Sequence, residues 1–168
     1  FELPHLDRKN VRYLDCGHAP IVTEHTFEFD PLIFNQCPNE CSLWGFYQTE
    51  KYFKHIENSI REDFTFKNEI LEPCFEFISE TDNPISLHVR RTDYIDNKAN
   101  HYNLGLDYYE TSLKLFDSNR QVLVFSDDPS WCKNQKLFTD DRFVISESHY
   151  NAIDLCLMSQ CISHIIAN

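Results

Sequence analysis

Two adjacent arginines stand out because they follow directly on an apolar stretch. Residues 85–89 run into Arg90 and Arg91, and Asp93 lies two residues further on. The planar guanidinium group matches phosphate oxygens bidentately, so the pair suits a phosphate-binding site. An arginine beside a carboxylate more often forms a simple ion pair, and the Arg-Arg-x-Asp string alone favours that role. Other parts of the sequence are needed to distinguish a phosphate-binding site from an ion pair.

A pair of carboxylates follows a second apolar stretch. Asp127 and Asp128 come after residues 121–125. Adjacent carboxylates suit a divalent cation, or a guanine base that donates two hydrogen bonds to one carboxylate. The cation lacks a third carboxylate at useful spacing, although Asp140 and Asp141 are not excluded. Asp128 precedes a proline and is therefore also a typical helix N-cap.

A histidine lies inside the first apolar stretch. His88 is most simply a buried, hydrogen-bonded core residue. A role as general base is the alternative, although the sequence shows no obvious second group for it. No Gly-x-Ser-x-Gly or His-Glu-x-x-His string occurs, so nucleophilic hydrolases and zincins have no support.

Composition excludes several classes of protein. The formal net charge is -12, which disfavours a nucleic-acid interface and an anionic membrane surface. The chain has 3 glycines, too far apart for a glycine-rich phosphate loop. Any phosphate site must therefore use side chains and helix N-termini.

The cysteines and the hydropathy of the chain indicate the cellular compartment in which the protein is expected. The chain has 7 cysteines at scattered spacing, as expected in a reducing compartment. Cys37 and Cys41 are spaced like a metal clip, but no second pair follows, so ordinary loop cysteines are favoured. There is no apolar run of transmembrane length and no signal peptide at the start, so we expect a cytoplasmic protein.

The first half of the chain predicts short strands and then helices. Strands are expected at 11–14, 26–29 and 42–47. From Glu50 the apolar residues fall at helical spacing, and a second helix is expected from about Asn68 to the turn at 81–84.

The second half alternates strands and helices more regularly. Strands are expected at 85–89, 121–125, 143–145 and 164–167, and helices from about 107, at 129–136 and at 151–161. In the last helix, the side chains that should face the core are those of Ala152, Leu155, Met158 and Ile162. Apolar strands alternating with helices predict an α/β fold with a parallel sheet covered on both faces.

Ligands of such sheets bind beyond the carboxyl ends of the strands. The predicted strand ends bring one set of polar residues to that rim: Arg90, Arg91, Asp93, Ser126, Asp127, Asp128, Ser146, Glu147 and Asn168.

Four segments carry a resemblance to a known family. They are His88-Val89-Arg90-Arg91-Thr92-Asp93-Tyr94, the run from Phe125 to Cys132, the run from Leu43 to Phe53, and the run from Asp154 to Asn168. In this order they resemble the motifs of the α-1,2-fucosyltransferases of glycosyltransferase family 11.

The resemblance implies a GT-B-like fold with two Rossmann-type domains. Residues 1–60 would then be a remnant of the N-terminal acceptor-side domain with its linking helix, and residues 61–168 the GDP-sugar-binding domain. The implied reaction is inverting transfer of L-fucose from GDP-fucose to the 2-hydroxyl of a galactose in a glycan acceptor, within glycan biosynthesis. No cofactor or metal is expected, no nucleic-acid partner is expected, and the oligomeric state is not predicted.

The resemblance also implies roles for single residues. Arg90 or Arg91 would bind the GDP diphosphate and stabilise its departure, as a preorganised cation does. Asp127 or Asp128 would read guanine. Asp93 would orient the arginines, and His88 and Asp93 are the candidates for the general base. The predicted donor site consists of His88, Arg90, Arg91, Ser126, Asp127, Asp128 and Asn168.

Two segments typical of the family, a Gly-Gly-Leu-Gly-Asn-Gln type and a Ser-Phe-Ser-Trp-Trp type, are not found in these 168 residues. One alternative to the transferase is therefore a non-catalytic GDP- or GDP-sugar-binding module, or an inactive fragment. Another is a structural α/β domain in which Arg90 and Arg91 only form ion pairs.

Overall fold

The computed structural model describes residues 4–9, 17–97, 99, 101–148 and 150–167. The chain divides into two compact units, Phe1–Thr65 and Phe66–Asn168. The predicted boundary at residue 60 lies inside a helix of the first unit. The assignment of these units to an acceptor side and a donor side stays a prediction.

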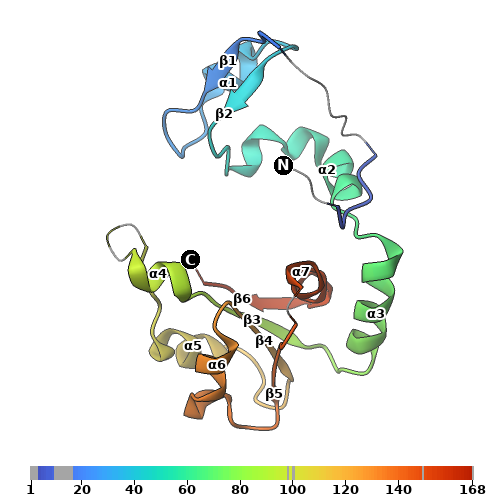
Figure 1. Ribbon diagram of the computed structural model, residues 1–168, viewed down its shortest axis with the longest axis vertical. Helices are drawn as coiled ribbons and strands as arrows, with labels where there is room; N and C mark the ends of the chain where they lie inside the picture. Colours follow the sequence, from blue (N-terminus) through green and yellow to red (C-terminus); the bar gives the residue numbers. More distant parts are fainter. Residues whose placement is uncertain (1–3, 10–16, 98, 100, 149, 168) are drawn as a thin grey trace. The chain divides into compact units, whose positions relative to one another are not determined.

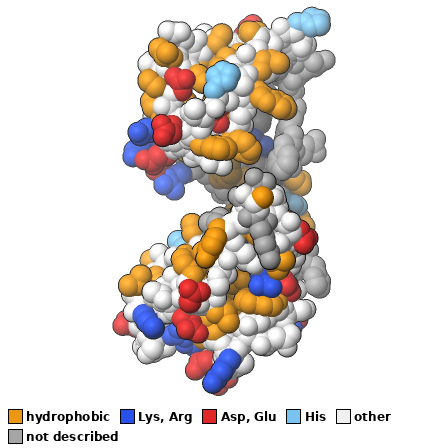
Figure 2. Space-filling view, turned by 90° about the vertical axis from the view of Figure 1, so that its left-hand side faces the viewer, with side chains coloured by type: hydrophobic (Ala, Val, Ile, Leu, Met, Phe, Trp, Pro, Cys, Tyr) orange, Lys and Arg blue, Asp and Glu red, His pale blue; other side chains and the backbone are white. Residues whose placement is uncertain are grey.

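The first unit is small and open. Its elements are β1 (Ile21–Thr23), α1 (Pro31–Gln36), β2 (Ser42–Trp44), the 3-10 turns η1 (Glu50–Tyr52) and η2 (Lys54–Ile56), and α2 (Glu57–Asp63). Strands β1 and β2 pair in parallel. Of its described residues only Leu6 and Asp63 are buried, whereas Trp44 and Phe46 are each 72% exposed. Figure 2 shows apolar side chains on the molecular surface.

One expectation for this unit was wrong, one holds only in part, and one cannot be compared. Residues 26–29 form a bend rather than a strand, because the chain turns into Asp30, which caps α1 by accepting hydrogen bonds from the N–H groups of Leu32 and Ile33. The strand expected at 42–47 stops at Trp44, because Gly45 and Tyr47 both adopt positive φ angles. The strand expected at 11–14 lies outside the described residues.

The second unit holds the main core. Its helices are α3 (Asn68–Ser79), α4 (Thr92–Asp96), α5 (Leu106–Leu113), α6 (Pro129–Lys133) and α7 (Asn151–Gln160), with a 3-10 turn η3 (Lys136–Phe138). Its strands are β3 (Ile85–Val89), β4 (Val122–Ser126), β5 (Phe143–Ile145) and β6 (Ser163–Ile165). All pair in parallel in the order β5-β4-β3-β6, which confirms the predicted α/β fold with a parallel sheet.

Helices cover both faces of this sheet (Figure 1). On one face Ile85, Leu87 and Val89 of β3 pack with α5 and α6. On the other face Leu123 and Phe125 of β4 pack against side chains of α3 and α7. Successive residues of a strand point to opposite faces, so these near-continuous apolar strands fill both layers.

Helix α7 bears out the expectation in part, because Ala152 and Met158 face the core but the other two expected residues do not. Leu155 and Ile162 are 56% and 76% exposed, whereas Ala152 and Cys156 are buried. The Cys74 thiol of α3 donates to the carbonyl of Ile153 at 3.9 Å, so the two helices approach closely. Small side chains at positions 152 and 156 permit that approach, and of these two only the buried Cys156 was not expected to face inward.

Candidate functional site

The sheet brings the two polar strand ends together. Strands β3 and β4 are in register with Val89 opposite Ser126, so the residues that follow leave the sheet at the same edge. The chain then passes from β3 to β4 and β5 on one side and returns through α7 to β6 on the other side of β3. The strand order reverses between β3 and β6, and doubly wound sheets bind ligands at the carboxyl edge beside such a reversal.

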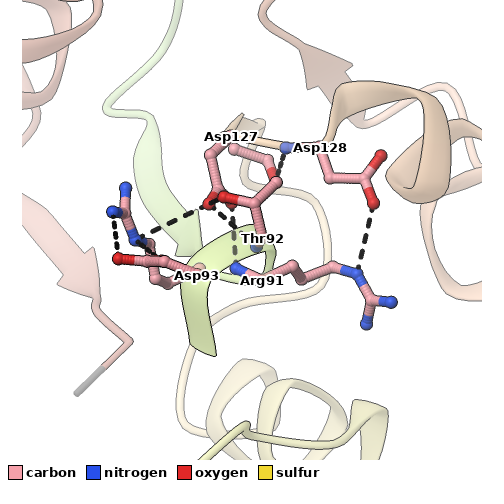
Figure 3. Close-up of polar contacts among 7 residues, drawn as sticks. Arg91, Thr92, Asp93, Asp127 and Asp128 are labelled. Atoms are coloured by element: carbon pink, nitrogen blue, oxygen red, sulfur yellow. Dashed lines mark hydrogen bonds and ion pairs between the residues drawn. The ribbon is translucent and has the colours of Figure 1, made fainter. Parts of the chain in front are cut away.

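Asp127 joins the two strand ends (Figure 3). Its carboxylate accepts hydrogen bonds from the backbone N–H of Arg91 at 2.9 Å, the N–H of Thr92 at 3.0 Å and the Thr92 hydroxyl. Burial raises the pKa of Asp127, but these hydrogen bonds and the Arg90 charge outweigh burial and hold the pKa below its ordinary value. The ionised carboxylate therefore fixes the start of α4.

Arg90 is paired with two carboxylates. Its Nε and Nη2 donate to the two oxygens of Asp93 at 2.9 and 2.8 Å, and Nε lies 3.6 Å from Asp127 Oδ2. The hydrogen bond from Arg90 is the main reason that the pKa of Asp93 is lowered. Asp93 thus orients Arg90, and the ion pair considered for this motif exists at Arg90.

Arg91 points the other way and lacks such partners. Its guanidinium carbon lies 3.8 Å from the ring centroid of Trp131, and its Nε is 3.5 Å from Asp128 Oδ2. The side chain is 17% exposed, and Nε is buried without a hydrogen bond. Among the described residues no group accepts a hydrogen bond from this guanidinium. Buried donors are normally satisfied, so a cation held in this way suits an anionic ligand.

Asp128 and Trp131 form the platform for Arg91. Asp128 caps α6, as predicted, because its Oδ1 accepts from the N–H of Trp131 at 3.0 Å. Its own N–H donates to Ser126 Oγ at 3.0 Å. These bonds place the indole under Arg91. Trp131 was not predicted as a site residue, although its position three residues after Asp128 at an Asp-Pro helix start was a usable signal.

His88 lies on the other face of β3. The alternation along the strand directs it, like Ser86, toward the layer of α3 and α7. Ser86 is buried and its hydroxyl forms a 2.7 Å hydrogen bond with Nδ1 of His164 on β6. Burial and then the Arg90 charge lower the pKa of His88 against the opposing effect of Asp127. The imidazole is therefore neutral near pH 7.

The remaining predicted rim residues have local roles. Ser146 donates to the carboxyl group of Asp154 at 2.6 Å, and burial raises the pKa of that carboxyl group. Glu147 forms an ion pair with Lys133 at 2.8 Å. Asn168 lies outside the described residues.

Two further features are absent from the described residues. No cluster of three or more His, Cys, Asp or Glu side chains could hold a metal ion. None of the helices in that part of the chain combines the length and apolar character needed to span a bilayer.

Known proteins resemble this chain. Residues 25–168 match the model of glycosyl transferase family 11. The O-antigen biosynthesis glycosyltransferase WbnK of Escherichia coli is 33% identical over 147 residues, which cover 79% of this chain and 49% of that protein. An alpha-1,2-colitosyltransferase of Escherichia coli is 35% identical over 136 residues, which cover 74% of this chain and 46% of that protein.

The chain thus spans about half the length of the curated relatives it matches. No solved structure matches it significantly. The family match extends over both the Arg90-Arg91 and the Asp127-Asp128 strand ends, and it shows that the chain belongs to glycosyl transferase family 11.

Proposed function

We propose that this chain provides the donor-binding side of an inverting glycosyltransferase that moves L-fucose from GDP-fucose to the 2-hydroxyl of a galactose in a glycan. Family membership supports glycosyl transfer in general. The linkage is supported by the relative whose name specifies an alpha-1,2 transferase. The donor sugar and the galactose acceptor rest on the motif resemblance.

The proposal rests mainly on the surroundings of the Arg91 side chain. It is a largely buried cation, stacked on Trp131, with no hydrogen-bond acceptor among the described residues. Two phosphate oxygens would supply those acceptors bidentately. Arg91, rather than Arg90, is therefore the proposed ligand of the diphosphate, because Arg90 already donates two hydrogen bonds to Asp93.

The same residues account for leaving-group stabilisation. When the glycosidic C–O bond to the diphosphate breaks, negative charge grows on the diphosphate oxygens. A guanidinium already held in place meets that charge without reorganising, so it stabilises the transition state more than the ground state. The proposal includes no metal ion, which is what the family resemblance implies.

The carboxylates and the histidine are the candidates for guanine recognition and for the general base. Asp127 already accepts three hydrogen bonds from Arg91 and Thr92, so Asp128 is the better candidate to read guanine. Asp93 is bound to Arg90 and its pKa is lowered, which makes it a poor proton acceptor. His88, neutral near pH 7, is the better of the two candidate bases.

A second donor is favoured by one specific observation. The relative that is 35% identical is named for colitose, which is L-fucose without the 3-hydroxyl. A site that hydrogen-bonds the 3-hydroxyl discriminates strongly against a sugar that lacks it, whereas an apolar site discriminates little. The competing proposal is thus a colitose donor, and a non-catalytic GDP-binding module is the third.

Calorimetric titration with GDP and ADP tests the proposal first. GDP should bind at least about tenfold more tightly than ADP, a difference of about 1.4 kcal/mol. Equal affinities, or no binding of either, would contradict the assignment of this rim to a GDP-sugar. GDP-fucose and GDP-colitose are then offered with lactose as the acceptor. Transfer separates an enzyme from a binding module, and the faster donor decides between the two sugars.

A further inference from the structure

The first unit holds a pair of thiols that the proposed function does not use. Cys37 Sγ and Cys41 Sγ lie 3.4 Å apart, and Cys37 is exposed while Cys41 is half-buried. Both are free thiols in the structure. A disulfide bond requires about 2.05 Å between the sulfur atoms, so side-chain rotation has only a short gap to close.

Anchored elements on each side bring these thiols together. Cys37 ends α1, whose Phe34 ring packs against Phe29 at 5.6 Å and against His55 at 5.2 Å between ring centroids. Cys41 directly precedes β2, and the N–H of Ser42 donates to the carbonyl of Pro20 at 2.9 Å. The connecting residues 38–40 begin with proline, which restricts the loop. The short sulfur-to-sulfur distance is therefore a property of the fold.

We propose that Cys37 and Cys41 form a modification site that a peroxide converts to an intramolecular disulfide. This inference does not depend on the proposed function. The exposed Cys37 sulfur attacks one oxygen of hydrogen peroxide, the O–O bond breaks, and a sulfenic acid and one water form. The Cys41 sulfur then attacks the Cys37 sulfur, the S–O bond breaks, and the disulfide and a second water form. Two thiols are oxidised and one peroxide is reduced.

The exposure of the two thiols fits this order. Cys37 is exposed and Cys41 is half-buried, so a peroxide reaches the Cys37 sulfur first. Cys37 is therefore the residue that attacks the peroxide, and Cys41 is the resolving one.

The chain contains a matched internal control. Cys74 and Cys156 lie on the packed helices α3 and α7 and are 2% and 0% exposed. Burial raises the pKa of both thiols, in Cys156 to about 12. A peroxide should leave this pair reduced while it oxidises Cys37 and Cys41.

A glutamate-specific protease gives a direct test on the 168-residue chain. Cleavage after Glu28, Glu40 and Glu50 places Cys37 in the peptide 29–40 and Cys41 in the peptide 41–50. The protein is treated with one equivalent of hydrogen peroxide, and its free thiols are alkylated under denaturing conditions. The protein is then digested, and the peptide masses are measured by mass spectrometry. We expect the two peptides to be joined, and to separate on reduction.

Single substitutions provide the controls. Cys37→Ser and Cys41→Ser should each abolish the joined peptides without shifting the melting temperature, because neither thiol is buried. The proposal is overturned if both peptides carry only alkylated thiols after peroxide treatment. It is equally overturned if Cys37 stops at the sulfinic acid or pairs with a different cysteine.

Discussion

Arg90 and Arg91 are neighbours in the sequence but have different surroundings. Their position after an apolar strand predicted that they would lie at the rim. The sequence could not show that Asp93 would occupy Arg90 and leave Arg91 without an acceptor, because that depends on the turn of α4 and on the Trp131 ring. The role of Trp131 required a contact between residues 40 positions apart.

Trp131 should act as a positioning residue for Arg91. The Trp131→Ala substitution removes the cation–π contact, which contributes about 0.5–2 kcal/mol, so GDP affinity should fall by roughly two- to thirtyfold. Trp131→Phe should retain part of the affinity, because a ring still underlies the guanidinium. Calorimetric titration measures both, and unchanged affinity in Trp131→Ala would show that the ring does not position Arg91.

His88 should make the stability of the protein depend on pH. Its pKa in the folded protein is below the unfolded value of about 6.5, so the unfolded chain binds the proton more readily. Its contribution to stability is complete above about pH 6.5 and declines as the pH falls toward the folded pKa. Arg90 opposes protonation, whereas Asp127 favours it.

The contrast between wild type and His88→Gln isolates this contribution. Urea unfolding between about pH 7 and pH 5 should show a smaller loss of free energy of unfolding in the variant than in the wild type. Parallel pH profiles of the two proteins would mean that His88 is not desolvated as the structure indicates.

At the level of elements, the apolar strands β3 and β5 were predictable, whereas the short helices α1 and α4 were not. Strand β5 has the predicted bounds, and β3 does as well, because buried parallel strands produce continuous apolar runs. Helix α4 was missed because its start depends on the distant Asp127 carboxylate rather than on a local cap. Helix α1 was not predicted, although Asp30 followed by Pro31 is a typical helix start.

Loss of the Asp127 carboxylate should lower the free energy of unfolding more than loss of the Asp128 carboxylate does. Asp127→Ala leaves the N–H groups of Arg91 and Thr92 without their acceptor, which costs about 2 kcal/mol or more. Asp128→Ala removes only an N-cap, which costs about 1 kcal/mol. Urea titration compares the two directly. The structural role of Asp127 is contradicted if Asp128→Ala proves the more destabilising substitution.

For the whole molecule, the sequence predicted a parallel sheet but not the order of its strands. Alternating strands and helices indicate parallel pairing, whereas the placement of β6 beside β3 depends on how α7 packs on α3. That order puts the topological reversal beside Arg90 and Arg91, which apolar patterning alone cannot show. The motif resemblance identified the family, which the family model confirms.

The described candidate donor residues all belong to the second unit. Residues 66–168 should therefore bind GDP with an affinity within about threefold of the whole chain, a difference below about 1 kcal/mol. Calorimetry on the folded fragment, with its circular dichroism as the folding control, measures this. A folded fragment that has lost GDP binding would place essential donor contacts in residues 1–65.

The central claim is that the Arg91 guanidinium binds the diphosphate of a GDP-sugar. GDP titrations of wild type, Arg91→Ala, Arg90→Ala and Arg142→Ala test it most directly, since Arg142 lies at the opposite end of the strands. A charge-assisted bidentate contact contributes about 1.5–3 kcal/mol, so Arg91→Ala should bind GDP more weakly by roughly ten- to hundredfold. Arg90→Ala should lose less, and Arg142→Ala should bind as the wild type does. Wild-type affinity in a folded Arg91→Ala protein would contradict the account.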